Sequence, residues 1–238
     1  MDDPHAQASR RAPTPGRPLL GLTILIVEDS RYASEAMRLL CLRSGARIRR
    51  ADCIKSARRH LQVYRPSAII IDLGLPDGSG LDLIAELDKS VPRVPILLAT
   101  SADLGADVAT LKAGADGFLE KPVTSLAVFQ AAILSRLPPE EQPPGPRQIN
   151  DETIFPDPLA LQDDLAHVAD VLNEADEEKT LDYVAQFVGG LARSALDTDL
   201  EQAASDLAKA RAEGRPLTSN TARIAGLVQD RLQQKRAI

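Results

Sequence analysis

The stretch Ile69-Ile70-Ile71-Asp72-Leu73-Gly74-Leu75-Pro76-Asp77-Gly78 decides the fold. Three β-branched apolar residues lead directly into a carboxylate, and a glycine and a proline follow within four residues. The apolar run predicts a strand buried on both faces, as in a parallel sheet, and the Pro and Gly residues predict a turn after it. Asp72 is therefore expected at the carboxyl end of a central strand, the edge where open α/β sheets bind their ligands.

Strand-like and helix-like segments alternate on both sides of this stretch. We expect Ser30 and Asp52 to cap the first two helices, because their side-chain oxygens can accept hydrogen bonds from free backbone N–H groups. Five strands, each followed by a helix, predict an α/β domain over residues 21–137, with a parallel sheet and helices on both faces. The expected strands are 22–27, 46–50, 68–71, 95–99 and 117–119. The expected helices are 30–43, 52–64, 79–90, 103–113 and 123–137.

Charge and proline content divide the chain into two modules. Residues 1–137 carry 18 Lys and Arg against 15 Asp and Glu, a net charge of +3, whereas residues 138–238 carry 10 against 19, a net charge of −9. Residues 138–157 are rich in proline, which predicts a stiff, extended linker. The proline-rich and polar residues 1–20 predict a disordered tail.

Residues 158–238 contain only helical patterns, with an apolar stripe in each of four segments. Four helices joined by short turns predict a small bundle, or a helical hairpin pair that dimerises into one. Thr198 and Glu201 have the spacing of a capping box at the start of the third helix. The stripes consist of Leu161, Leu165, Val168 and Leu172; Leu181, Val184, Val188 and Leu191; Leu200 and Leu207; and Ile224, Leu227, Val228 and Leu232.

Composition and sequence pattern argue against several classes of protein. Cys41 and Cys53 are too few for a disulfide framework and fit a reducing cytoplasm. The apolar run 19–27 ends in Glu28-Asp29 rather than in a small-residue cleavage site, so it predicts a core strand and not a signal peptide. No run approaches the roughly 20 apolar residues of a membrane span. The acidic second half argues against nucleic acid as its partner.

Polar residues follow the other strands at the edge where Asp72 is expected. The first strand ends in Glu28-Asp29, the fourth in Thr100, and the fifth leads into Lys121. Carboxylates that converge in one pocket repel one another, and a hard divalent cation with oxygen ligands, such as Mg²⁺, relieves that repulsion. With an ammonium group and a hydroxyl beside it, Asp72 is suited to act as a nucleophile that carries a phosphoryl group.

These motifs resemble, in order and approximate spacing, the receiver domain of two-component response regulators. The resemblance covers residues 22–137 and implies a flavodoxin-like sheet of order 2-1-3-4-5. It implies that Asp72 accepts phosphate from a histidine kinase or a histidine phosphotransfer protein, with Thr100 and Lys121 as helpers. It implies a Mg²⁺ ion held by Asp29, Asp72 and the carbonyl of Gly74, with Glu28 reaching it through water.

The resemblance further implies a cis peptide bond before Pro122 and a switch residue at Phe118, which would move inward when Thr100 moves onto the phosphate. We then expect the face formed by residues 103–113, 117–119 and 123–137 to be a dimer or output surface. The haloacid dehalogenases also use an Asp at the end of a strand, but they need a second Asp two residues later. Gly74 occupies that position here.

The sequence leaves three functions open for residues 158–238. The first is a module that binds a protein effector or forms a homodimer. The second is a phosphotransfer bundle, but His167 lacks the Lys and Gly that follow the reactive His in that family. The third is DNA binding, but the last helix does not form a basic recognition helix. Its cations are Arg223, Arg231, Lys235 and Arg236. The expected protein is a cytoplasmic switch that catalyses no reaction beyond its own phosphorylation and dephosphorylation.

Overall fold

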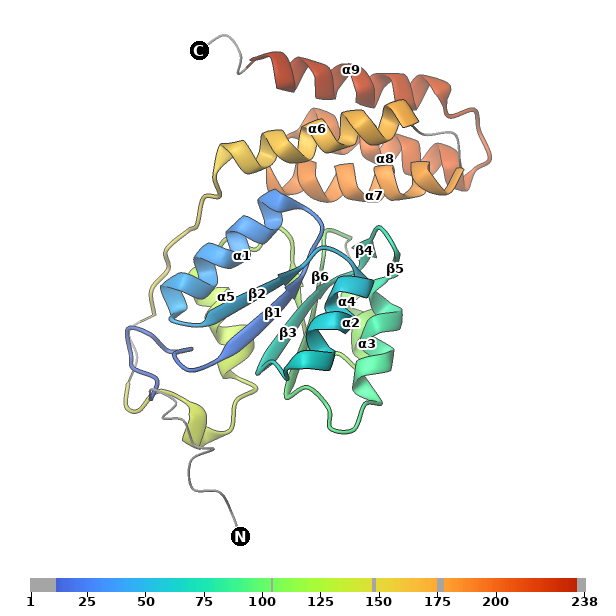
Figure 1. Ribbon diagram of the computed structural model, residues 1–238. Coiled ribbons are helices and arrows are strands. Elements are labelled where there is room, and N and C mark those ends of the chain that lie inside the picture. The colour runs from blue at the N-terminus through green and yellow to red at the C-terminus, as the bar shows by residue number, and fades with distance from the viewer. Residues whose placement is uncertain (1–11, 104, 147–148, 175–177, 235–238) are drawn as a thin grey trace.

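Figure 1 shows an α/β domain with a group of C-terminal helices packed on one end of its sheet. The computed structural model describes residues 12–103, 105–146, 149–174 and 178–234. Five parallel strands form the sheet in the order β2-β1-β3-β6-β7, which confirms the predicted order of the five main strands. Their bounds are β1 (Thr23–Val27), β2 (Arg47–Ala51), β3 (Ala68–Asp72), β6 (Ile96–Ser101) and β7 (Gly117–Glu120).

Alternating side chains of the strands supply two apolar cores, one on each face of the sheet. Ile26 and Ile70 face the core beneath α1 and α5, whereas Ile69 and Ile71 face the core beneath α2 and α3. All residues of β3 are buried, as expected for a central parallel strand. The helices are α1 (Arg31–Ser44), α2 (Ile54–Val63), α3 (Gly80–Asp88), α4 (Ala106–Lys112) and α5 (Leu126–Leu134).

The helix starts confirm one predicted cap and correct another. Ser30 caps α1 and accepts a hydrogen bond from the N–H of Ala33. Asp52 does not cap α2, so that prediction was wrong. The carboxylate of Asp77 accepts the first N–H groups of α2 instead, at 2.8 and 2.9 Å. Asp77 can do so because it lies in the turn of a short hairpin, β4 (Gly74–Leu75) and β5 (Gly78–Ser79), that the sequence pattern did not predict.

Parts of the expected tail and linker lie against the α/β domain. Leu19 is fully buried in the core beneath α1, so packed structure begins within the segment predicted to be a tail. Residues 1–11 lie outside the described part of the chain. In the linker, Ile154 is buried in the same core, and Thr153 forms a bridge to Ser125. A single 3₁₀ turn, η1, covers Pro139–Glu141.

The C-terminal region contains four helices that close around one core, as the apolar stripes predicted. Helix α7 packs against α6 and α8, and α9 packs against the same two helices. Asp197, not Thr198, caps α8, and Glu201 pairs with Arg193 rather than completing a capping box. Within the described residues, no helix is both long and apolar enough to span a membrane. The bounds are α6 (Pro158–Glu174), α7 (Glu178–Ser194), α8 (Thr198–Ala212) and α9 (Thr218–Gln234).

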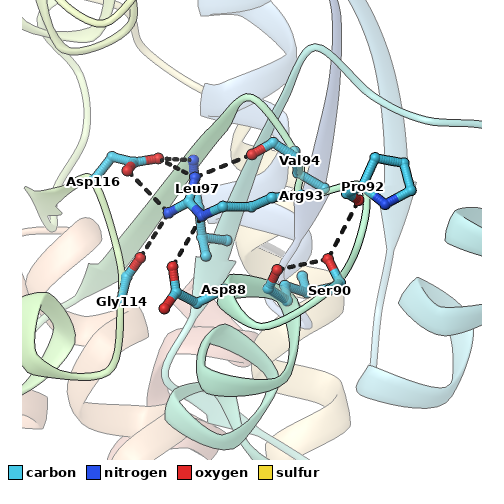
Figure 2. Close-up of polar contacts among 9 residues, drawn as sticks. Asp88, Ser90, Pro92, Arg93, Val94, Leu97, Gly114 and Asp116 are labelled. Carbon is cyan, nitrogen blue, oxygen red and sulfur yellow. Dashed lines mark hydrogen bonds and ion pairs between the residues drawn. The ribbon is translucent and has the colours of Figure 1, made fainter.

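Arg93 ties together the loops at the amino end of β6, opposite the Asp72 edge (Figure 2). Its guanidinium donates to both carboxylate oxygens of Asp116 at 2.9 and 3.0 Å, to Asp88 at 2.9 Å and to the carbonyl of Gly114 at 2.8 Å. Asp116 also accepts the N–H of Leu97 at 2.7 Å. A planar guanidinium is needed for this arrangement, because a lysine cannot pair with both oxygens of one carboxylate.

We expect Arg93→Lys to lower the free energy of unfolding by about 1–2 kcal/mol, because several charge-assisted hydrogen bonds are lost. Arg58→Lys is the matched control. Arg58 pairs with Glu86 at the surface, and we expect that variant to lose much less stability than Arg93→Lys, because solvent screens an exposed ion pair. Urea unfolding of both variants measures the difference, and equal losses would contradict the role given to Arg93.

Candidate functional site

The topology brings four of the predicted site residues to one edge of the sheet. Asp72 is the last residue of the central strand β3. Glu28 and Asp29 follow the end of the neighbouring strand β1, and Lys121 follows the end of β7. Because all these strands are parallel, their carboxyl ends meet, and the polar residues that follow them converge.

Lys121 bridges two carboxylates in the buried part of the site. Its Nζ lies 2.8 Å from Oε2 of Glu28 and 2.9 Å from Oδ1 of Asp72, and each of the three side chains is less than a tenth exposed. The other Glu28 oxygen accepts the N–H of Ser30 at 3.2 Å. A buried charge without a partner destabilises a protein strongly, so these ion pairs keep the three side chains together.

The site holds more negative than positive charge. Burial raises the pKa of Glu28 to about 8 despite the attraction of Lys121, and the charge of Asp72 adds to the rise. Burial, and next the charge of Asp72, raise the pKa of Asp29 to about 7. For Lys121, burial alone would lower the pKa, but the charges of Asp72 and Glu28 outweigh it and raise the pKa above its ordinary value.

Glu28, Asp29 and Asp72 form an acidic cluster in which one oxygen from each lies within 4.8 Å of the others. This all-oxygen donor set and its surplus negative charge fit a hard divalent cation such as Mg²⁺. A bound cation would offset the charge of Asp72, which after burial contributes most to the raised pKa of Asp29. The acidic cluster is therefore consistent with the magnesium site expected from the sequence.

Thr100 and Phe118 lie close to the cluster but contact other groups. Thr100 pairs with Asp72 in the register of β3 and β6, yet its buried hydroxyl donates to the carbonyl of Leu119 at 2.8 Å. Phe118 is half-buried and packs against the core on the α2–α3 face of the sheet. The peptide bond between Lys121 and Pro122 is cis, as the resemblance implied.

Three residues of the helical region also reach the site, and sequence reasoning missed all three. The hydroxyl of Tyr183 donates to Asp29 at 2.9 Å, and Gln186 lies against Gly74. Asp164 accepts hydrogen bonds from the start of α1. Only Asp164 left a signal in the sequence, because it places a carboxylate on the apolar face of its helix, between Leu161 and Leu165.

The fold and the site together define a doubly wound α/β domain whose sheet edge carries an acidic cluster and a buried lysine. Residues 24–133 match the family of response regulator receiver domains, so this part of the chain is a receiver domain of two-component signalling, and a helical C-terminal region follows it.

Curated relatives resemble the chain over only part of their length. The chain is 30% identical to the KDP operon transcriptional regulatory protein KdpE of Escherichia coli K12, over 65% of each protein. It is 34% identical to the probable transcriptional regulatory protein TcrX of Mycobacterium tuberculosis, over 48% of this chain and 50% of that protein. The chain thus spans between half and two thirds of the length of these relatives.

Solved structures resemble the receiver part as well. The receiver domain of a signal transduction histidine kinase from Syntrophus aciditrophicus is 28% identical, with a TM-score of 0.44, over 49% of this chain and 89% of that chain. The receiver domain of a sensor histidine kinase from Pseudomonas aeruginosa is 26% identical, with a TM-score of 0.43, over 48% of this chain and 95% of that chain.

The raised pKa of Glu28 predicts how stability depends on pH in the absence of metal. A carboxyl group whose pKa rises on folding stabilises the folded state while it is protonated. That contribution is present below about pH 4.5 and is lost as the pH rises towards 8. Glu28→Gln should therefore lose less stability than the wild type between pH 5 and 8, as measured by urea unfolding in EDTA. Glu120→Gln, at an exposed position, is the control, and a wild-type pH slope in Glu28→Gln would contradict the prediction.

Proposed function

We propose that the chain is a response regulator that accepts a phosphoryl group on Asp72 from a histidine kinase or a histidine phosphotransfer protein. The observation that carries the proposal is the buried ammonium of Lys121, which bridges Asp72 and Glu28 beside a third carboxylate. An ion pair with a purely structural role needs no third carboxylate beside it. A site that binds a phosphoryl group together with a divalent cation does need one, because the carboxylates are the ligands of the cation.

Each residue at the edge has a role in this proposal. A carboxylate oxygen of Asp72 bonds to phosphorus while the bond from phosphorus to the donor imidazole nitrogen breaks, and the electron pair returns to the imidazole. Lys121 and Thr100 bind oxygens of the transferred group. Asp29, Asp72 and the carbonyl of Gly74, with Glu28 through water, would hold Mg²⁺, and the ion would neutralise the negative charge of the transferred group.

The proposed switch couples this chemistry to the receiver surface. Thr100 must leave the carbonyl of Leu119 to reach a phosphoryl oxygen, and that movement makes room for Phe118 to turn inward. The face formed by α4, β7 and α5 carries exposed apolar side chains, Val108, Leu111 and Val128, each more than half exposed. We propose that this face forms a homodimer or binds a protein effector.

The charge pattern of the helical region favours a protein partner over DNA. In α9, Arg223 pairs with Asp206 at 2.8 Å and Arg231 pairs with Asp197 at 2.9 Å, so both cations are already matched within the region. Phosphate contacts would need cations that are clustered and available. In this proposal the protein acts in the cytoplasm and catalyses only its own phosphorylation and dephosphorylation.

One observation supports a second candidate, phosphotransfer through His167. The imidazole is exposed, and its Nε2 lies 3.5 Å from the hydroxyl of Tyr183, which donates to Asp29. His167 thus contacts the tyrosine that donates to the acidic cluster, and both side chains line the groove that reaches Asp29. Its ring also packs edge-on against Phe187.

We expect Asp72→Asn to reduce labelling by acetyl phosphate and Mg²⁺ to background, because an amide cannot act as the nucleophile. Asp77→Asn, five residues further on, is the matched control and should label like the wild type. Intact-mass measurement of each protein reads out the phosphoryl group. Labelling that persists in Asp72→Asn would remove Asp72 from this role. If that remaining label is then lost when His167→Gln is added, it belongs to His167.

A further inference from the structure

The C-terminal helices lie over the carboxyl edge of the sheet, where Asp72 ends β3 (Figure 1). Helices α6 and α7 both pack against α1, and α7 also packs against β4 of the short hairpin. The helical region therefore contacts the receiver domain at the phosphoacceptor edge, in addition to the linker that joins them.

One contact occupies a carboxylate of the acidic cluster. The hydroxyl of Tyr183 donates to Oδ2 of Asp29 at 2.9 Å, and the Tyr183 ring packs against Phe187 with ring centroids 5.6 Å apart. Phe187 is buried, so its packing fixes the tyrosine ring in place. A cation that uses Asp29 as a ligand must compete with this hydroxyl.

A second contact closes the space above Asp72. A Cβ atom at Gly74 would lie 2.5 Å from Cδ of Gln186, so the glutamine side chain lies directly against the backbone of Gly74. The cavity between Asp72, Lys121 and α7 measures about 20 Å³, room for about one water molecule. A phosphoryl group on Asp72 would enter this same space. Helix α7 contributes Gln186, Phe187, Gly190 and Leu191 to its wall.

A third contact anchors the helical region on α1. The carboxylate of Asp164, which is 2% exposed, accepts hydrogen bonds from the hydroxyl of Ser30 at 2.8 Å and from the N–H groups of Arg31 at 2.8 Å and Tyr32 at 2.9 Å. These N–H groups belong to the first turn of α1 and have no acceptor within that helix. The anchor begins one residue after Asp29.

A separate approach to the acidic cluster lies beside α6. A groove beside α6 is lined by Asp29, Asp163, His167 and Asp170 and leads to the acidic cluster. A cation can approach Asp29 along this acidic groove, whereas a protein that must place a phosphohistidine on Asp72 meets α7. The two approaches can therefore be tested separately.

We propose that α6 and α7 form a cover over the phosphoacceptor pocket and that Asp72 accepts phosphate only when this cover has moved away. The inference rests on the proposed function and adds its regulation. Tyr183 competes with the cation for Asp29, and Gln186 and Gly190 form the wall of the pocket that the phosphoryl group would enter. Since coupling between two events is reciprocal, loosening the cover promotes phosphorylation, and phosphorylation releases the cover.

The test uses two full-length variants that weaken the cover at different contacts. Tyr183→Phe keeps the ring packing and removes only the hydroxyl, and Asp164→Ala removes the anchor on α1. Tyr64→Phe in the receiver domain and Asp182→Ala, whose ion pair with Arg211 lies within the helical region, are the matched controls. Calorimetry measures the Mg²⁺ dissociation constant, intact mass measures the labelling rate with acetyl phosphate, and circular dichroism verifies that each variant is folded.

We expect Tyr183→Phe to bind Mg²⁺ about three- to tenfold more tightly, the size of one hydrogen bond to a charged group. Asp164→Ala should raise the labelling rate at saturating Mg²⁺ by a similar factor, and the controls should match the wild type. Unchanged affinity and rate in both variants, with a wild type that binds and labels, would overturn the cover but leave the proposed function standing. Absence of labelling in every protein, including the loosened variants, would overturn the proposed function itself.

Discussion

The structure depends on one buried ammonium group, Lys121, held between the carboxylates of Glu28 and Asp72. Burying these charges is favourable only if they remain paired, and the five parallel strands keep them paired because their carboxyl ends meet at one edge. Asp29 adds a further negative charge that Lys121 does not balance. The edge therefore attracts a hydrogen-bond donor or a cation, and in this structure the Tyr183 hydroxyl of the chain's own helix α7 donates to Asp29.

The sequence predicted the receiver domain well because its signals are local. The run from Ile69 to Gly78 specifies a buried strand followed by a turn, and the acids, hydroxyl and lysine at the other strand ends follow the same logic. The errors are local as well. Asp52 was the expected cap of α2, but the hairpin of β4 and β5 places Asp77 there instead, because a carboxylate from a neighbouring turn satisfies the same N–H groups.

The relation between the two modules could not be predicted in this way. Tyr183 and Gln186 meet Asp29 and Gly74 across more than a hundred residues of sequence, and no periodicity or motif encodes such a contact. The difference in net charge and the proline-rich segment predicted two modules. Neither feature indicates which surfaces of the two modules meet. The buried Asp164 on an apolar helix face was the one signal that this face meets polar groups and not only its own bundle.

The central claim is that the surplus negative charge at the sheet edge is met either by the chain's own helices or by a cation with a phosphoryl group. Hydrogen exchange at the backbone amides of Arg31 and Tyr32, followed by NMR, tests it most directly because both donate to Asp164 only while the helices are docked. The account predicts protection in the unmodified protein and exchange about tenfold faster or more once Asp72 is phosphorylated. Protection that is the same in both states would contradict it.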